Sequence, residues 1–278
     1  MKICFPLADV SVKEVTEPGK VTDPLHDDDL WQISQHEFAM KVEGVGSFYA
    51  CYGSEIEYSA VHGVSEEEIH LYLNGSVYGA ILYQRGILPL HGSCFSYNQS
   101  GVMLCGESGV GKSALTAAFT LNGGIFYTDD VTPVIISDDK PCILPFSDRI
   151  KLWEDTFSQI NLDKSGSDLI RPDYRKYYLR MGKSTNEMNP LNLIYVLSLN
   201  DGNEAIISEI SGSSKFPALY NQIYRREYLK GMPEIEKKFF DDLIKTCNEV
   251  RVFNLARPEK IAVTDLMEVL KEHIGSVV

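Results

Sequence analysis

The sequence predicts an α/β fold preceded by a β-rich segment. A pair of strands that begins at Ile87 leads through a glycine-rich loop into a helix over residues 112–121. Residues 1–60 contain short runs that alternate apolar and polar side chains, which is typical of half-buried strands. We therefore expect a β-rich segment with one helix over residues 1–85 and an α/β domain over residues 86–278.

Local patterns place the other elements. Ser65 and Glu68 form an S-x-x-E capping box, which predicts a helix over residues 66–84 that Gly86 ends. Pro258 is expected to open a last helix that reaches about residue 273. Strands are expected at 38–42, 54–59, 87–97, 102–105, 125–127, 131–137, 191–199, 205–210 and 251–255, and an amphipathic helix at 232–247.

Composition and net charge limit the kinds of ligand that the chain is expected to bind. With 278 residues and 44% hydrophobic residues, the chain can bury a core without help from metals or disulfides. Its formal net charge of −13 argues against binding to a nucleic-acid backbone or to an anionic membrane, because both rely on Lys and Arg. Nucleotides stay open as ligands, since they need only a few well-placed donors.

The cysteines and the apolar runs predict a cytoplasmic protein. None of the six cysteines forms a C-x-x-C pair, so they are expected to be buried thiols in a reducing compartment. Pro6 and Asp9 interrupt any signal-peptide core at the start of the chain. No apolar run reaches the roughly 18 residues that span a bilayer.

The clearest motif is a phosphate-binding loop, G-x-x-x-x-G-K-[ST]. Its glycines permit backbone angles that bring consecutive N–H groups around phosphate oxygens, next to the positive end of a helix. Lys112 is expected to reach the β- and γ-phosphates, and Ser113 to supply a hydroxyl ligand to Mg²⁺. The predicted ATP site comprises Gly106, Glu107, Ser108, Gly109, Val110, Gly111, Lys112, Ser113 and Ala114.

Two further signals lie near this loop in the expected fold. Asp129 and Asp130 end the next strand, where one carboxylate could bind Mg²⁺ and the other could accept a proton from an attacking hydroxyl. Neighbouring residues of an extended segment point in opposite directions, so the two can serve different partners. The strand pair should also return His91 to the loop, where a histidine beside a carboxylate can tune proton transfer.

The order and spacing of the loop, His91 and the aspartate pair resemble the HPr-kinase-like family of bacterial serine kinases. The similarity is densest over residues 75–134 and includes the segment from Gln84 to Ser93. The resemblance implies the nucleotide-binding fold that this family shares with phosphoenolpyruvate carboxykinases. It also implies that ATP and Mg²⁺ are used, and relatives in the family are often homo-oligomers.

The resemblance further implies roles for the site residues. Ser113 and Asp130 would hold Mg²⁺, Asp129 would be the base toward a serine hydroxyl, and His91 would lie near that carboxylate. The roles of Asp129 and Asp130 can also be reversed.

The chain departs from the family after the aspartate pair. The family motif E-x-R-G-x-G is replaced by the stretch Phe146-Ser147-Asp148-Arg149-Ile150-Lys151-Leu152-Trp153. This argues against HPr as the acceptor and against a reverse phosphorylase reaction. The short leading segment also makes the chain look more like the smaller homologues that tailor peptides, some of which resemble kinases of lasso-peptide precursors.

Basic residues are the remaining candidates for catalysis. An arginine or lysine near the γ-phosphate can stabilise charge that develops during transfer. We select Arg149, Lys151 and Arg225 from a group that also includes Arg171, Arg175, Lys176, Arg180 and Arg226. Trp153 and the tyrosines near Tyr177 could either stack on adenine or pack in the core.

The leading hypothesis is an ATP-dependent, Mg²⁺-requiring kinase of a serine in a peptide or small protein. A kinase of a small hydroxylated metabolite would need the same residues, so the sequence leaves it open. A nucleotide-binding switch without transfer activity is the third hypothesis.

Overall fold

The structure is a computed structural model that describes residues 7, 9–171, 174–181 and 187–278. The chain forms two units. One comprises Met1–Pro89 and Ile223–Asp242, and the other comprises Leu90–Gln222 and Leu243–Val278. The expected boundary after residue 85 lies close to the observed division, but residues 223–242 belong with the N-terminal part.

The first unit is built on a sheet of six strands in the order β1-β6-β5-β4-β3-β2. β1 runs parallel to β6, and the other neighbours are antiparallel. The strands are β1 (Ser11–Glu14), β2 (His26–Asp27), β3 (Trp31–Ile33), β4 (Glu37–Val42), β5 (Gly46–Cys51) and β6 (Glu55–Ala60). The alternation in the sequence thus correctly predicted β4 and β6.

A helical segment follows the sheet as predicted. It runs as α1 (Glu66–Tyr72), the π-helical η1 (Leu73–Val77) and α2 (Tyr78–Gln84). The backbone N–H of Glu68 donates to the Ser65 hydroxyl at 3.2 Å, which confirms the capping interaction. Gly86 then adopts a φ of 61°, where a glycine is favoured, and the helix ends.

Aromatic packing explains why residues 223–242 belong to the first unit. The Tyr228 ring, fully buried, has its centroid 4.9 Å from that of Phe38 and 5.4 Å from that of Tyr83. Phe239 lies 5.0 Å from Tyr83 in the same way. These rings come from η3 (Arg226–Gly231) and from α6 (Pro233–Glu249), which begins in the first unit and ends in the second.

The second unit contains a sheet of eight strands. Its order is β11-β10-β7-β8-β15-β17-β16, with β9 paired to β7. β8, β15 and β17 are mutually parallel, whereas β7 and β16 run antiparallel to their neighbours β8 and β17. The strands are β7 (Leu88–Tyr97), β8 (Ser100–Gly106), β9 (Ile125–Thr128), β10 (Val131–Ser137), β11 (Lys140–Ile143), β15 (Asn189–Asn200), β16 (Ile206–Ile210) and β17 (Arg251–Pro258).

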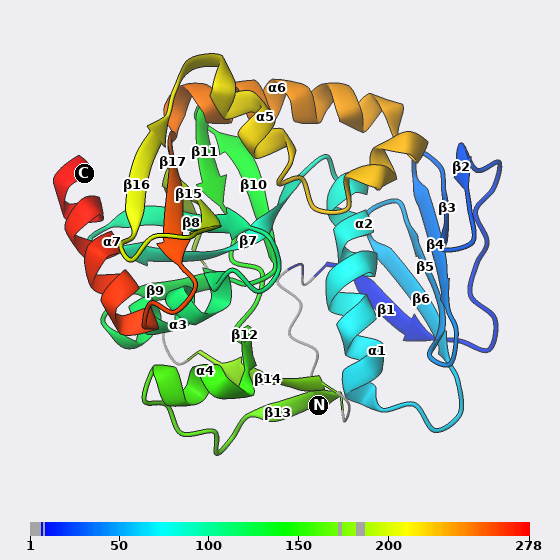
Figure 1. Cartoon of the computed structure of the whole chain (residues 1–278). Helices are drawn as coiled ribbons and strands as arrows, with labels where there is room; N and C mark the ends of the chain where they lie inside the picture. The colour runs from blue at the N-terminus through cyan, green and yellow to red at the C-terminus, as the bar shows by residue number, and fades with distance from the viewer. Residues whose placement is uncertain (1–6, 8, 172–173, 182–186) are drawn as a thin grey trace. The chain divides into compact units, whose positions relative to one another are not determined.

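Two helices on the same side of this sheet shape the site. α3 (Lys112–Leu121) and α7 (Val263–Val277) pack against each other, as Figure 1 shows in green and red. The predicted span of α3 is confirmed. α7 begins later than expected, because Pro258 is the last residue of β17 and a turn separates it from the helix. The unit also contains α5 (Lys215–Tyr220) and the short η2 (Gly212–Ser214).

A second, smaller sheet lies in the same unit. It has three strands in the order β12-β14-β13, all antiparallel. These are β12 (Arg149–Trp153), β13 (Asp168–Arg171) and β14 (Tyr174–Arg180), and α4 (Glu154–Gln159) follows β12. Ile150 and Leu152 alternate along β12 into the hydrophobic core that includes Leu115 of α3. The mixed content of sheets and helices makes the fold α/β, as predicted, with a β-rich N-terminal part.

Candidate active site

The phosphate-binding loop connects β8 to α3, as its sequence predicts. Gly106, Gly109 and Gly111 have positive φ values of 125°, 86° and 104°. Gly106 also tolerates no side chain, because a Cβ there would lie 2.5 Å from the carbonyl oxygen of Leu197. The loop therefore needs glycine for its conformation and for its close approach to β15.

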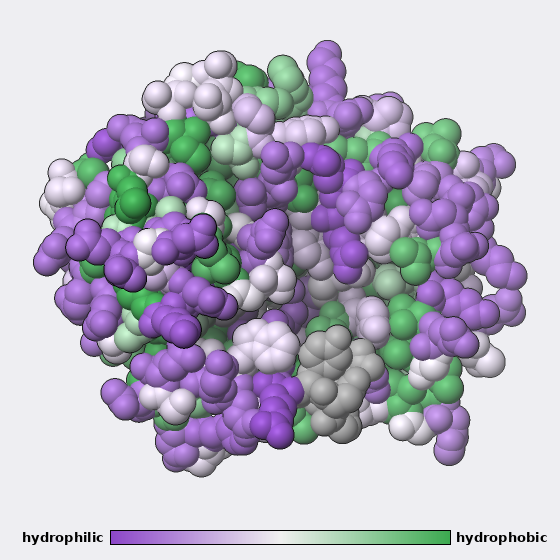
Figure 2. All heavy atoms as spheres, viewed as in Figure 1, coloured by the Kyte–Doolittle hydropathy of each residue, from purple (hydrophilic) through white to green (hydrophobic). Residues whose placement is uncertain are grey.

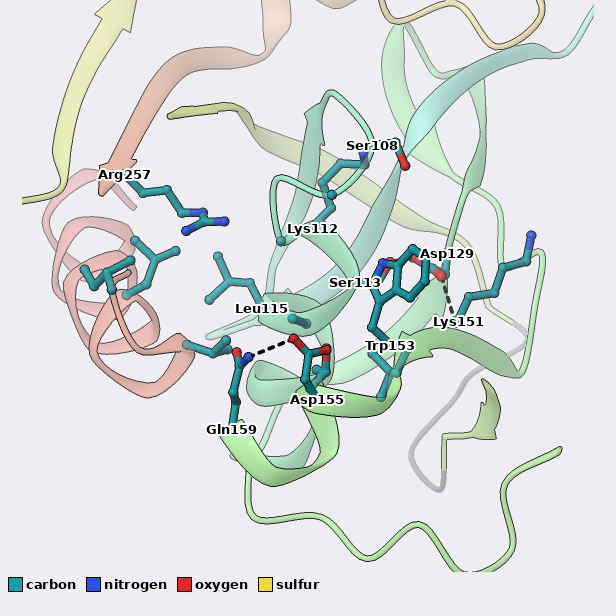
Figure 3. Close-up of a pocket in the computed structure, with 18 of the residues that line it drawn as sticks. Ser108, Lys112, Ser113, Leu115, Asp129, Lys151, Trp153, Asp155, Gln159 and Arg257 are labelled. Carbon is teal, nitrogen blue, oxygen red and sulfur yellow. Dashed lines mark hydrogen bonds between the residues drawn. The ribbon is translucent and has the colours of Figure 1, made fainter. Parts of the chain in front are cut away.

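Lys112 is the first residue of α3 and reaches back into the loop. Its ammonium donates to the carbonyl oxygens of Gly106 at 2.7 Å and Glu107 at 2.9 Å. Figure 3 shows the side chain extending toward Ser108. Burial lowers the pKa of Lys112. A buried ammonium inside a loop of this kind is well placed for anionic oxygens.

Ser113 and Asp129 place two oxygen atoms that could bind a metal beside Lys112. The Ser113 hydroxyl donates to Asp129 Oδ1 at 2.7 Å. The second carboxylate oxygen, Oδ2, accepts from the backbone N–H of Lys151 at 3.0 Å. Hydroxyl and carboxylate oxygens are the ligands that Mg²⁺ prefers, and Mg²⁺ takes only one or two of them from the protein when substrate phosphates supply others. The Ser113 hydroxyl and the Asp129 carboxylate therefore fit as the protein ligands of a magnesium ion that also binds a nucleotide.

Asp130 points into a different environment. Its Oδ2 lies 2.7 Å from the Lys151 ammonium, and its Oδ1 lies 3.5 Å from His91 Nδ1. Burial alone would raise the pKa of Asp130, but Lys151 and then His91 outweigh it and hold the pKa well below its usual range. Its φ of 74° is unusual for a residue with a Cβ.

His91 is tied to the same turn. Its Nδ1 lies 3.0 Å from the backbone carbonyl oxygen of Asp130, and since a carbonyl can only accept, the hydrogen bond requires the proton on Nδ1. Burial lowers the pKa of His91, although Asp130 opposes the shift. The shift favours the neutral form of the imidazole.

A cavity of about 520 Å³ joins these residues. Lys112, Ser113, Asp129, Asp130, Lys151 and Lys176 line its charged end. Leu115, Ile261, Val263 and Leu266 line an apolar end, where Asp155 and Gln159 of α4 also lie (Figure 3). A polar end and an apolar end in one cavity suit a ligand with a charged tail and a flat hydrophobic group.

Arg257 fixes one wall of this cavity. Its Nε donates to the carbonyl oxygen of Val110 at 2.7 Å, and its NH1 donates to the carbonyls of Pro258 and Glu259 at 2.9 and 3.0 Å. It thereby joins the phosphate-binding loop to the turn between β17 and α7. Sequence reasoning missed Arg257, because nothing local distinguishes an arginine near the end of a strand.

A second cavity, of about 800 Å³, shares His91, Ser108 and Gly109 with the first. Gln222 closes one side, where its side-chain oxygen accepts from Gly106 N at 3.3 Å and its carbonyl accepts from His91 N at 2.6 Å. Leu197 and Leu199 of β15 make the lining largely apolar. The loop thus has accessible space beyond the first cavity.

Comparison with known proteins adds little to this geometry. No protein-family model and no curated protein matches the chain. Among solved structures, it is similar to the HPr(Ser) kinase/phosphatase from Coxiella burnetii. The two are 12% identical with a TM-score of 0.38, over 68% of this chain and 97% of that one. At this score the likeness carries no argument about activity, so the function rests on the site.

The structure brings most of the predicted site residues together. One or both cavities are lined by the whole predicted loop from Gly106 to Ala114, by His91, by both aspartates and by Lys151. Arg149 does not line either cavity, and its guanidinium lies 4.8 Å from the centre of the Tyr178 ring. Arg225 belongs to the first unit, where it lies 5.5 Å from the Trp31 ring, and its catalytic role stays a prediction.

Lys176 is the cation that the sequence-based selection passed over. It lines the first cavity from β14, with its ammonium 5.2 Å from the centre of the Trp153 ring. Burial and the nearby Lys151 lower the pKa of Lys176. Trp153 is 41% exposed at the cavity, so it is not a core residue.

The described residues also bear on the expected metal and on the expected absence of a membrane span. No cluster of three or more His, Cys, Asp or Glu side chains that could hold a metal occurs among them. This is compatible with a magnesium ion bound mainly by phosphates. None of the described helices is long and apolar enough to cross a membrane. The face shown in Figure 2 is largely hydrophilic, with hydrophobic residues scattered over it.

Proposed function

We propose that the chain is an ATP-dependent, Mg²⁺-requiring kinase that transfers the γ-phosphoryl group to a serine hydroxyl of a peptide or small protein. The observation that carries the proposal is that the two aspartates contact different partners. Ser113 and Asp129 share one hydrogen bond, whereas Asp130 faces His91 and Lys151. Phosphoryl transfer needs these two groups, one for the metal and one for the hydroxyl.

The loop and Lys112 would bind the phosphates, and Arg257 would hold the loop in shape. Leu115, Ile261 and Leu266 offer an apolar surface for the base. Bound Mg²⁺ would neutralise charge on the β- and γ-phosphate oxygens, with Ser113 and Asp129 as its protein ligands.

Asp130 would orient the acceptor hydroxyl and take its proton as the bond from oxygen to phosphorus forms. The bond between the γ-phosphorus and the bridging oxygen breaks, and the electron pair leaves with ADP. Lys151, 2.7 Å from Asp130, would stabilise charge on the transferred group. A strongly basic carboxylate is not required, because the transition state of phosphoryl transfer is loose.

This assignment reverses the first of the two orders considered from the sequence, in which Asp129 was the base and Asp130 the metal ligand. The hydrogen bond from Ser113 to Asp129 supports the reversal, because the loop hydroxyl and a carboxylate commonly share the magnesium ion in phosphate-loop enzymes.

The proposal is tested by incubating the protein with ATP, Mg²⁺ and serine-containing peptides and recording their intact mass. A gain of one phosphate on serine supports it. ADP formed only with a small hydroxylated metabolite would instead indicate a metabolite kinase. ATP binding without any turnover would indicate a nucleotide-binding switch.

Two variants separate the aspartates. Asp130→Asn is expected to lower kcat by roughly 10²- to 10⁴-fold, as for loss of a proton acceptor, with little change in the Mg²⁺ requirement. Asp129→Asn is expected to raise the Mg²⁺ concentration needed for half-maximal turnover. Asp139→Asn is the matched control, because Asp139 is 93% exposed and pairs only with Lys245 among the described residues. The opposite pattern would restore Asp129 as the base.

A further inference from the structure

The small sheet presents one strongly cationic face. In the register of β12 and β14, Arg149 lies opposite Arg180, Lys151 opposite Tyr178, and Trp153 opposite Lys176. Directly opposed residues of antiparallel strands project to the same side. We call this set the cationic face, and it consists of Arg149, Lys151, Trp153, Lys176, Tyr178 and Arg180.

The two sides of the sheet differ sharply. Ile150 and Leu152 project to the other side, into the hydrophobic core. The register places Tyr177 and Leu179 with them, and both pack against that core. Packing into the core thus explains the residues on one side of the sheet, but it does not explain the charged residues of the cationic face.

The charges on this face are only partly compensated. Asp148 lies 3.9 Å from Arg149 and 3.3 Å from Arg180, and Asp130 pairs with Lys151. Lys176 makes no ion pair with any described residue and has the Trp153 ring as its neighbour. Four cations against two carboxylates are conspicuous in a chain whose net charge is −13. Like charges placed opposite each other across a sheet are destabilising, so folding alone does not favour Arg149 beside Arg180.

An unsatisfied polar group lies on the same face. Tyr178 is 5% exposed, and its hydroxyl has no hydrogen-bond partner among the residues that the structure describes. A buried hydroxyl without a partner is destabilising, and a polar group of a ligand can offset that cost.

The cationic face continues directly from the proposed transfer site. Lys151, Trp153 and Lys176 line the first cavity, whereas Arg149 and Arg180 lie one row further along the strands. Two residues along a strand advance by about 7 Å. Side chains two residues apart in an extended peptide have the same spacing and point to the same side. A peptide that runs along these strands with its serine at Asp130 and Lys151 therefore places the second neighbour of that serine near the pair of arginines.

We propose that the cationic face binds an acidic segment of the acceptor peptide, with an Asp or Glu two residues from the phosphorylated serine held by Arg149 and Arg180. This rests on the proposed function and names its substrate class. A single-stranded nucleic acid fits less well, because such binding needs several exposed aromatic rings and Tyr178 is buried.

The test measures binding by fluorescence anisotropy. It uses a labelled serine peptide with Asp at the positions two before and two after the serine, and the same peptide with Asn there. The acidic peptide is expected to bind about tenfold more tightly, as for one charge-assisted contact. Arg180→Glu should abolish this preference and should instead favour a peptide with Lys at the two positions. Arg180→Gln should abolish it without reversing it.

Arg175→Glu is the matched control. Arg175 lies on the same strand but projects to the other side of the sheet, where its side chain is 86% exposed and 3.6 Å from Glu154. It should keep the preference within about twofold, because exposed ion pairs contribute little.

Equal binding of the acidic and neutral peptides overturns the proposal, as does an equal loss in Arg175→Glu. Tighter binding of single-stranded oligothymidylate than of the acidic peptide also overturns it. The phosphorylation assay is separate. An acidic preference in binding without phosphate transfer supports the cationic face and contradicts the kinase, whereas transfer without any preference does the reverse.

Discussion

The two sheets of the second unit serve a ligand in different ways. The eight-stranded sheet provides the backbone of the phosphate-binding loop, where Gly106 approaches the carbonyl of Leu197 so closely that only glycine fits, beside the side chains of His91 and Arg257. The three-stranded sheet contributes side chains, with Lys151, Trp153 and Lys176 projecting into the cavity. At Gly106 the backbone leaves no room for an added atom, whereas a site made of side chains loses affinity or rate one group at a time.

The largest effect is expected at Gly106, where the backbone conformation requires glycine. Gly106→Ala combines a φ of 125° with a Cβ 2.5 Å from the carbonyl oxygen of Leu197. We expect it to destabilise the protein by more than about 2 kcal/mol, above the usual range for a positive φ alone, and to abolish ATP binding. Urea unfolding and nucleotide titration measure the two effects.

Gly109→Ala is the matched control for this variant. Its φ is 86°, but nothing lies within 4 Å of a Cβ there. It should cost only about 1–2 kcal/mol. If both alanine variants behaved alike, the close approach to β15 would not matter and the contrast between the sheets would fail.

The next effect concerns the small sheet. Lys151→Met removes the ammonium 2.7 Å from Asp130 and should lower the rate of transfer by about 10²- to 10³-fold, as for loss of a preorganised donor. Lys164→Met, on an exposed lysine that pairs with Glu154, should leave the rate unchanged. Single-turnover kinetics provide the measurement, and a loss confined to KM would contradict a role in the transition state.

Lys176→Met should have a smaller effect. A unit charge several ångströms from the phosphoryl group contributes on the order of 1–2 kcal/mol at an effective dielectric constant of about 20, so a loss of about tenfold is expected. A loss as large as that of Lys151→Met would make Lys176 a direct partner of the transferred group. The ratio of the two rates therefore ranks the two lysines.

The smallest effect is a pH dependence at His91. Because burial lowers its pKa in the folded protein, the unfolded chain binds the proton first as the pH falls below about 6.5. The contribution of the neutral histidine to stability is present above that pH and is lost as the pH falls through the folded pKa. Between about pH 7.5 and about pH 5, wild type should lose more stability than His91→Asn. Chemical denaturation at both pH values decides this, and an equal loss would contradict it.

Sequence reasoning worked best where local chemistry determines structure. The glycines of the loop and the helix that starts at Lys112 follow from short-range rules, and both are observed. Asp129 and Asp130 were expected to end an extended strand, but β9 ends at Thr128 and Asp130 has a φ of 74°. Arg257 was missed, and Lys176 was among the candidate cations but was not selected, because the places of both residues depend on the pairing of β14 and β17 with strands distant in sequence. The hydrogen bond from Ser113 to Asp129 and the positive φ of Asp130 were not indicated by any local pattern.

The same limit explains the division of the chain. Residues 223–242 look like part of the second domain in sequence order, yet Tyr228 and Phe239 pack with Phe38 and Tyr83. Contacts between residues so distant in sequence arise from tertiary packing, which the hydrophobic periodicity of the sequence does not reveal.

This packing has a consequence for the newly synthesised chain. Tyr228 is fully buried among Trp31, Phe38 and Tyr83, so the first ninety residues lack the centre of their own core until the ribosome has made most of the protein. The N-terminal sheet must wait while the residues of the second unit up to Gln222 emerge. We therefore expect the segment that leaves the ribosome first to complete its structure late, in contrast to domains that fold as soon as they are synthesised.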